Sequence, residues 1–293
     1  MKLDSEMYKQ ITEINQFLEK EHLCLPIHSR MNMTFFNDLL NRIRKENEIS
    51  EILPLIEEFI ISPYDRAYQT VYKYRELEIF KPFYKVIDFA TLSFYRGNYT
   101  CSYVTLVPVI EGIIKEWENL NPLLENGSKP YACPKCKHTW GKERCSPQKY
   151  IKEQKELFET TLEKDNYYHN WIYTLWEYLA KLLGTVFYEH HKPFKKKSEN
   201  GENFNRAIAS HMLEKPESFC KRINVIRLFL LIDVIAELYF RKNKKKYSKL
   251  NSASTLEFKE RLRFPYEKIY TECSAPSNIA SYETLLNNIH VSQ

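Results

Sequence analysis

The sequence predicts an all-α protein, and three observations support this fold class. Only 6 of the 293 residues are glycine, whereas average usage would give roughly 20, and an all-β sandwich needs glycine-rich turns every ~8–12 residues. Apolar residues recur instead at spacings of three and four, the period of a helix that buries one face. Neither a P-loop nor a G-x-G-x-x-G string occurs, so the common phosphate-cradling α/β folds are excluded.

The first helices are predicted from apolar spacing and from residues that cap or break helices. Met7, Ile11, Ile14 and Leu18 predict a helix from Asp4 to Glu21. Ser, Thr and Gly caps and the Ser62-Pro63 break delimit the helices that follow. We expect these at Thr34 to Glu46, Ser50 to Ile61, Asp65 to Glu78 and Lys81 to Tyr95, and from Asn98 or Thr100 to Leu120. Because Pro108 lies inside the last one, we expect a kink there or a start near Thr105.

Residues 121–147 differ in character from the helices around them. Prolines, glycines and cysteines crowd together there, which predicts an insertion without regular helix. After it, Ser146-Pro147 starts a long helix, and the Tyr-, Trp- and Leu-rich stretch from Asn166 to His190 is predicted to be the most buried part of the chain. The remaining helices are expected at Asn203 to Leu213, Ser218 to Lys242 and Ser254 to Glu272.

The longest apolar helix candidate runs from Ile223 to Phe240 and is interrupted by Arg227, Asp233 and Glu237. These charges favour a buried core helix over a membrane span. The first residues of the chain lack the apolar core of a secretory signal. Seven cysteines, an odd number without such a signal, favour a reducing compartment. We therefore expect a soluble, cytoplasmic protein that does not enter a membrane.

The charge balance is mildly basic, with 43 Lys and Arg against 38 Asp and Glu, a formal net charge of +5. This balance neither requires nor repels nucleic acid. Two basic runs stand out: one contains Lys195, Lys196 and Lys197, and the other extends from Arg241 to Lys246. A solvated loop or a helix C-terminus is the favoured interpretation of each run taken alone. Contact with RNA phosphates is the alternative, for which Lys195, Lys196 and Lys197 are the candidates.

One short segment has the residue types that RNA cleavage needs. In Asn205-Arg206-Ala207-Ile208-Ala209-Ser210-His211, an arginine precedes a histidine with four residues between them. Neutral histidine can take the proton of a ribose 2′-OH near pH 7, and arginine can stabilise the charge that develops on the phosphorus oxygens. This scheme requires no metal. The bare pattern is expected about once by chance in such a chain, so its context decides its meaning.

That context resembles the HEPN superfamily, in its bacterial branch of abortive-infection and toxin-type ribonucleases. Phe204 to His211, followed by the apolar segment Asn224 to Asp233, is similar to the R-x4-H motif and the helix after it. Phe94 to Tyr99, followed by Pro108 to Ile114, is similar to an earlier helix pair that carries an acidic residue. The resemblance covers roughly Lys81 to Tyr239. It implies an N-terminal helical region at 1–80 and a HEPN-like helical bundle at 81–293, which contains the Cys-rich insertion at 121–149.

The resemblance also implies roles for individual residues. His211 would be the general base, Arg206 the phosphate-binding cation, and Glu111 the acid that orients Arg206 across a helix interface, while Asn205 belongs to the same motif. A five-residue step on a helix separates two side chains by ~140°, and the homodimer that the resemblance implies would complete the site. The implied activity is metal-independent endoribonuclease cleavage by a toxin or anti-phage defence effector, with a regulatory protein as a further partner. The alternative is a non-catalytic RNA-binding or partner-regulating module.

The insertion contains a second candidate site, made of Cys133, Cys136, His138 and Cys145. A Cys-x2-Cys turn brings two thiolates within reach of one tetrahedral Zn²⁺, and His138 or His169 would supply the missing ligand. Four protein ligands would make this zinc structural. An exposed loop with free thiols is the alternative. The aromatic residues Tyr167 to Tyr178 are interpreted as core, with base stacking as the alternative.

Overall fold

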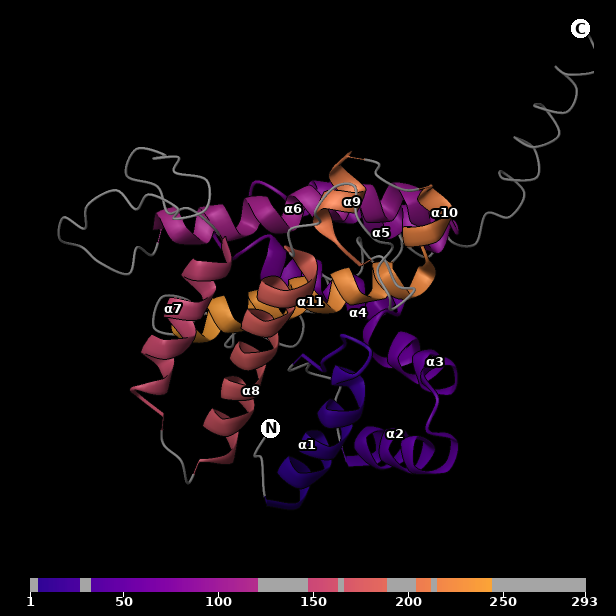
Figure 1. Cartoon of the computed structure of the whole chain (residues 1–293), viewed down its shortest axis with the longest axis vertical. Helices are drawn as coiled ribbons and strands as arrows, with labels where there is room; N and C mark the ends of the chain where they lie inside the picture. The colour runs from indigo at the N-terminus through magenta and orange to yellow at the C-terminus, as the bar shows by residue number, and fades with distance from the viewer. Residues whose placement is uncertain are drawn as a thin grey trace, which may run out of the picture.

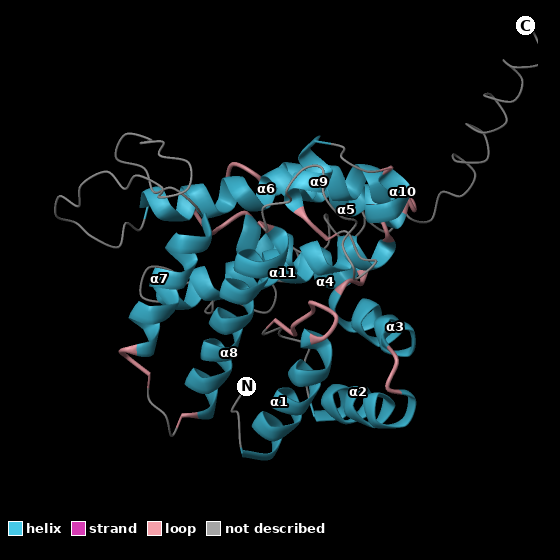
Figure 2. Cartoon of the chain, in the orientation of Figure 1, coloured by secondary structure: helices cyan, strands magenta, loops and turns pink. Residues whose placement is uncertain are grey.

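The structure is a computed structural model, and it describes residues 5–26, 33–120, 147–162, 166–188, 204–211 and 215–243. Within these ranges the regular structure is helical throughout, without a strand (Figure 2). This confirms the predicted all-α class. None of the described helices has both the length and the apolar character that crossing a membrane requires.

The helices follow one another along the chain with short connections. In the N-terminal part they are α1 (Ser5–Glu19), α2 (Met33–Glu46), α3 (Ile49–Ile60), α4 (Pro63–Gln69) and the π-helix η1 (Thr70–Tyr74). They continue with α5 (Tyr84–Tyr95), α6 (Tyr99–Leu120), α7 (Pro147–Glu159), α8 (Tyr167–Leu182) and the π-helix η2 (Leu183–Phe187). The last ones described are α9 (Arg206–His211), α10 (Pro216–Phe219) and α11 (Arg222–Lys242).

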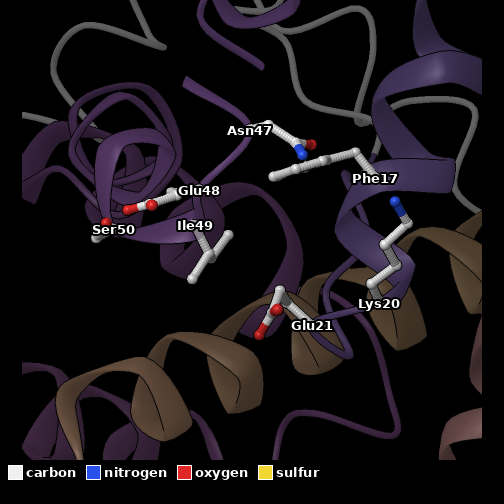
Figure 3. Close-up of a pocket in the computed structure, with 7 residues that line it drawn as sticks. All are labelled: Phe17, Lys20, Glu21, Asn47, Glu48, Ile49 and Ser50. Carbon is white, nitrogen blue, oxygen red and sulfur yellow. The ribbon is translucent and has the colours of Figure 1, made fainter. Parts of the chain in front are cut away.

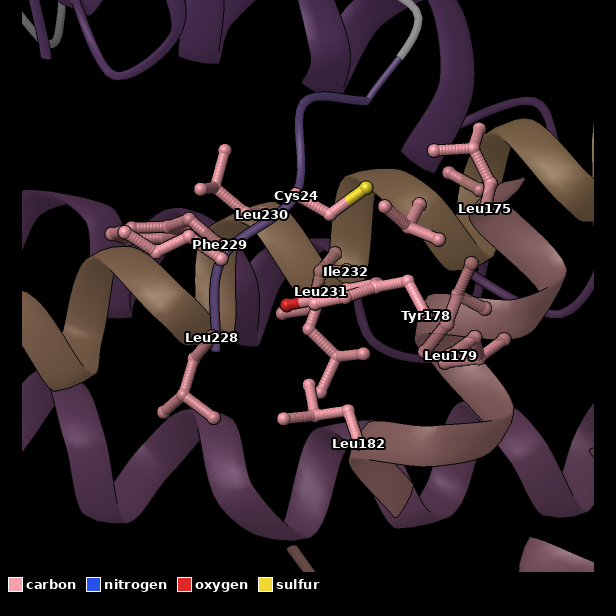
Figure 4. Close-up of a cluster of buried hydrophobic side chains, with 14 of the residues drawn as sticks. Cys24, Leu175, Tyr178, Leu179, Leu182, Leu228, Phe229, Leu230, Leu231 and Ile232 are labelled. Carbon is pink, nitrogen blue, oxygen red and sulfur yellow. The ribbon is translucent and has the colours of Figure 1, made fainter. Parts of the chain in front are cut away.

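Helix α11 is the centre of the core. All of its residues from Asn224 to Phe240 are buried, and it packs against α6, α8 and η1. In Figure 1 it runs across the middle of the molecule, with α5, α6 and α9 above it and α1, α2 and α3 below. Figure 4 shows the leucines of α8 and α11 packed around Cys24 and Tyr178. The prediction of a buried core helix between Ile223 and Phe240 is confirmed.

One hydrophobic cluster joins the N-terminal helices to the rest of the chain. It extends from Met7 in α1 to Phe240 in α11, and α1 packs on both α2 and α8. Helices α1, α2 and α3 each bury one apolar face, as their sequence spacing predicts. The helices before and after residue 80 therefore share a core, and the division of the chain at that point stays a prediction.

The charged residues in the interior of α11, namely Arg227, Asp233 and Glu237, are buried together with its apolar ones, and each has a partner in the N-terminal part of the chain. Arg66 of α4 donates to Asp233 through both η nitrogens and from Nε to the Ile60 carbonyl at 3.2 Å. Lys73 of η1 forms an ion pair with Glu237. Because a buried charge without a partner costs several kcal/mol, these pairs fix α4 and η1 against α11.

The structure decides the start of one helix and differs from the sequence-based expectations at two others. Helix α6 begins at Tyr99, in agreement with a start at Asn98 or Thr100, and it contains Pro108 in its interior, so the alternative start near Thr105 is wrong. The helix expected from Asp65 to Glu78 ends at Tyr74, and its second half is π-helical. The long apolar helix begins at Arg222, because Ser218, where it was expected to begin, lies inside a separate short helix, α10. The expected helix from Ser254 to Glu272 lies outside the described residues.

Candidate functional site

Helix α9 carries Arg206 as its first residue, and the two residues before it attach the helix to the core. Phe204 is buried, with its ring centroid 5.8 Å from that of Phe187 in η2. Asn205 is buried as well and donates from Nδ2 to the Val186 carbonyl at 2.9 Å. The Asn205 amide thereby supplies a hydrogen-bond donor to the Val186 carbonyl, which lies near the end of the π-helix η2. These two contacts fix the place where α9 begins, and with it the position of Arg206.

Helix α6 carries Glu111 and packs directly against α9. Its start is well defined: Gly97 turns the chain with a φ of +75°, and the Asn98 side chain accepts a hydrogen bond from the Cys101 N–H at 3.0 Å. Glycine tolerates the left-handed backbone conformation that ends α5 here. The register of α6 then places Glu111, on its partly exposed side, opposite the start of α9.

Glu111 binds two cations, one on each carboxylate oxygen. Its Oε2 accepts a hydrogen bond from Arg206 Nε at 2.9 Å, and its Oε1 lies 3.5 Å from Nζ of Lys115, one turn further along α6. The side chains of Glu111, Arg206 and Lys115 are 21%, 34% and 64% exposed. Two cations against one carboxylate leave a formal charge of +1 on a surface that solvent reaches.

The ring of Tyr188 completes the surroundings of Arg206. The guanidinium carbon lies 5.6 Å from the ring centroid, within the range of a cation–π contact. Burial raises the pKa of the Tyr188 hydroxyl above its usual value, and the Glu111 carboxylate raises that pKa further. The positive charge of Arg206 lowers it in part. The hydroxyl oxygen is buried and has no hydrogen-bond partner in the described part of the chain. Tyr188 therefore contributes its ring face to the site and remains a neutral phenol.

This arrangement can hold an anion. The hydrogen bond to Glu111 uses Nε of Arg206, which restrains the guanidinium without engaging its terminal nitrogens. Those nitrogens form the planar fork that suits phosphate oxygens. Lys115 adds a second, more exposed cation next to the same carboxylate. The contact between Glu111 and Arg206 is the one that the sequence led us to expect, and the catalytic role of the pair stays a prediction.

Several residues proposed from the sequence cannot be placed. His211 is the last residue of α9, but its side chain lies outside the described part of the structure, as do the basic residues Lys195, Lys196 and Lys197. The proposed zinc ligands Cys133, Cys136, His138 and Cys145 fall in the same category. Within the described residues, no group of three or more His, Cys, Asp or Glu side chains is arranged to hold a metal ion.

The aromatic residues of α8 lie mainly in the core, as the sequence predicted. Trp171, Trp176 and Tyr178 are buried, whereas Tyr167 is 38% exposed. Sequence reasoning missed Lys115 and Tyr188 as members of the site. Lys115 was recognisable in principle, because it follows Glu111 by four residues and so lies on the same face of a helix. Nothing in the sequence indicated that Tyr188 faces Arg206, because the two residues belong to different elements.

A surface pocket lies among the N-terminal helices, where α1 ends and α2 connects to α3. Its volume is about 390 Å³. Figure 3 shows the lining residues: Phe17, Lys20, Glu21, Asn47, Glu48, Ile49 and Ser50. Glu21 also forms an ion pair with the buried Arg227 of α11, at 3.5 Å. The lining carries one lysine and two glutamates, which favours no particular ligand.

Comparisons with known proteins add no relative: no family model matches the chain, and neither a curated protein nor a solved structure matches it.

Proposed function

We propose that the chain is a metal-independent endoribonuclease of the HEPN type, which acts as a toxin or anti-phage defence effector in the cytoplasm. In this proposal His211 takes the proton from a ribose 2′-OH, and the 2′ oxygen attacks the neighbouring phosphorus. The bond from that phosphorus to the 5′ oxygen of the next nucleotide breaks, the 5′ oxygen takes a proton from water and leaves as a hydroxyl, and the RNA strand ends in a 2′,3′-cyclic phosphate. Arg206 binds the phosphate and stabilises the charge of the transition state. Two copies of the chain form the active dimer, a regulatory protein controls it, and a structural Zn²⁺ binds the Cys-rich insertion.

The observation that carries the proposal is the ion pair between Arg206 and Glu111. The arginine of the R-x4-H motif is partly exposed, and it is held by an acidic residue of the earlier helix pair. The guanidinium of Arg206 is more accessible than that of Arg66, which is buried in its ion pair with Asp233. A restrained but accessible guanidinium is what a phosphate-binding residue requires.

A non-catalytic RNA-binding or partner-regulating module on the same helical scaffold is the second candidate. Two positions next to the motif favour it: Ala207 follows the arginine, where a polar residue is frequent in the resembled family, and Met212 follows the histidine, where a glycine is common. Such a module would keep the ion pair and the exposed cations while lacking cleavage.

Three variants separate these candidates: Arg206→Ala, His211→Ala and the surface control Lys152→Gln on α7. We expect the wild type and the control to arrest growth on expression and to fragment cellular RNA, and the two motif variants to do neither. Loss of a residue that acts in the transition state lowers the rate by about 10²–10⁴-fold. Sizing chromatography checks that each variant keeps the oligomeric state of the wild type.

Purified protein and a short RNA substrate give the decisive measurement. The products should carry 2′,3′-cyclic phosphate, and cleavage should persist in EDTA. If the wild type and both motif variants leave RNA intact under all conditions, the ribonuclease assignment is lost and the binding module remains. Metal content measured on protein purified without chelator tests the zinc proposal separately, and a sample without stoichiometric zinc contradicts it.

A further inference from the structure

Lys115 lies beside the candidate site without belonging to the motif that defined it. Its ammonium is 3.5 Å from Oε1 of Glu111, while Arg206 occupies Oε2 of the same carboxylate. The lysine side chain is 64% exposed. A pair of this kind within one helix is common on protein surfaces and stabilises the helix only slightly. Here the carboxylate also binds a cation from a second helix, and in contrast to the buried Glu237 it holds both cations at a surface that solvent reaches.

Because the two cations share one carboxylate, their positions are linked. Glu111 and Lys115 are one turn apart, so their backbones are separated by about 6 Å along α6. Arg206 binds the Glu111 oxygen from the α9 side, and Lys115 binds the other oxygen from the next turn of α6. The result is two positive groups on the two oxygens of one partly exposed carboxylate, so that a strand following this surface can present consecutive phosphates to them.

We propose that Lys115 binds the phosphate next to the one held by Arg206, so that the site engages two consecutive phosphates of a single-stranded RNA. This rests on the proposed function for the identity of the ligand. Glu111 is then a positioning residue for both cations, and Lys115 contributes affinity for the strand without taking part in the chemical step. Because the Glu111 carboxylate lies between the two cations, the site favours a ligand with two phosphates, such as a nucleic acid strand, over one isolated phosphate.

The test is RNA affinity as a function of salt. The wild-type chain, Lys115→Gln and the control Lys152→Gln are titrated with a single-stranded RNA whose 2′-hydroxyls are methylated, so that the strand cannot be cleaved. Lys152 is a matched control, because it also pairs within its helix, with Glu156 at 4.0 Å, and its side chain is 72% exposed. Loss of one phosphate contact on a single strand lowers the magnitude of the slope of log K against log salt concentration by about 0.7. At about 0.1 M salt this corresponds to a roughly fivefold lower affinity for the strand.

We expect that reduction for Lys115→Gln, no change for Lys152→Gln, and recovery in Lys115→Arg. Equal affinities and slopes for Lys115→Gln and Lys152→Gln would overturn the proposal, as would the absence of measurable RNA binding by the wild type. The ribonuclease proposal fails independently of this test. If wild-type protein binds the methylated strand through Lys115 but never cuts unmodified RNA, the phosphate contact stands and catalysis does not.

Discussion

Arg206 is held by two groups that act on it in different ways. Glu111 accepts a hydrogen bond from Nε, which fixes the direction of the guanidinium plane, and the face of Tyr188 lies 5.6 Å away. The first contact is charge-assisted and directional. The second depends on the ring and not on the hydroxyl, which has no hydrogen-bond partner in the part of the chain that is described. Their different origins make the two contacts separable by mutation.

We predict that Tyr188→Phe retains RNA cleavage and that Tyr188→Leu loses part of it. The leucine removes the cation–π contact, worth about 0.5–2 kcal/mol, so that the cleavage rate should fall roughly 2- to 30-fold while KM changes little. Single-turnover rates and KM for an RNA substrate give the measurement, with Tyr167→Leu as a control on an exposed aromatic residue. A phenylalanine variant as slow as the leucine variant would show that the hydroxyl, and not the ring, is what matters.

At the scale of elements, the helices that present the site begin at well-defined residues. Asn166 caps α8, because its Oδ1 accepts hydrogen bonds from the N–H groups of Tyr168 at 3.1 Å and His169 at 3.3 Å. Helix α8 runs directly into η2, and Tyr188 follows η2. The hydrogen bond from Asn205, before α9, to the Val186 carbonyl of η2 places Tyr188 and Arg206 next to each other.

Replacement of the cap should weaken the fold without touching the site. We expect Asn166→Ala to lower the free energy of unfolding by about 1 kcal/mol. Asn166→Asp should remain close to the wild type, because its carboxylate also accepts from the first N–H groups and suits the positive end of the helix dipole. Chemical denaturation monitored by circular dichroism measures both. An alanine variant as stable as the wild type would show that the cap contributes nothing.

The helices were predictable because their signals are local. Gly97, Pro147 and Asn166 each lie within two residues of a helix end in the structure. The partners of the charges on α11 were not predictable, because Asp233 and Glu237 pair with residues more than 160 positions earlier in the chain. The same limit applied to the site: the spacing within the motif is local, whereas the contact of Tyr188 with Arg206 depends on how two elements pack.

At the scale of the whole molecule, buried ion pairs join the N-terminal helices to α11. Glu237 is 2% exposed and binds both Lys73 of η1 and Arg241 of its own helix. Burial alone would raise the pKa of Glu237, but the two cations more than compensate and hold that pKa below its ordinary value. The carboxylate therefore stays ionised in the folded state to lower pH than it does in the unfolded chain.

This linkage predicts an acid-dependent loss of stability. A lowered folded-state pKa contributes stability that is present above the unfolded pKa and is lost as the pH falls through the folded value. Glu237→Gln should lower the free energy of unfolding by about 3 kcal/mol near pH 7, and the difference from the wild type should shrink below about pH 4. Denaturation between pH 3 and 8, with Glu156→Gln as an exposed control, tests this. A difference independent of pH would contradict the role of the Glu237 charge.

The pairing of Arg66 with Asp233 also has a consequence for the synthesis of the chain. The two residues are 167 positions apart, and a ribosome adds about 5–20 residues per second, so Arg66 is made roughly 8–30 s before its partner. Throughout that interval the carboxylate that pairs with the Arg66 guanidinium in the finished protein has not yet been made. The N-terminal helices can therefore reach their final packing only after most of α11, the last helix described, has been translated.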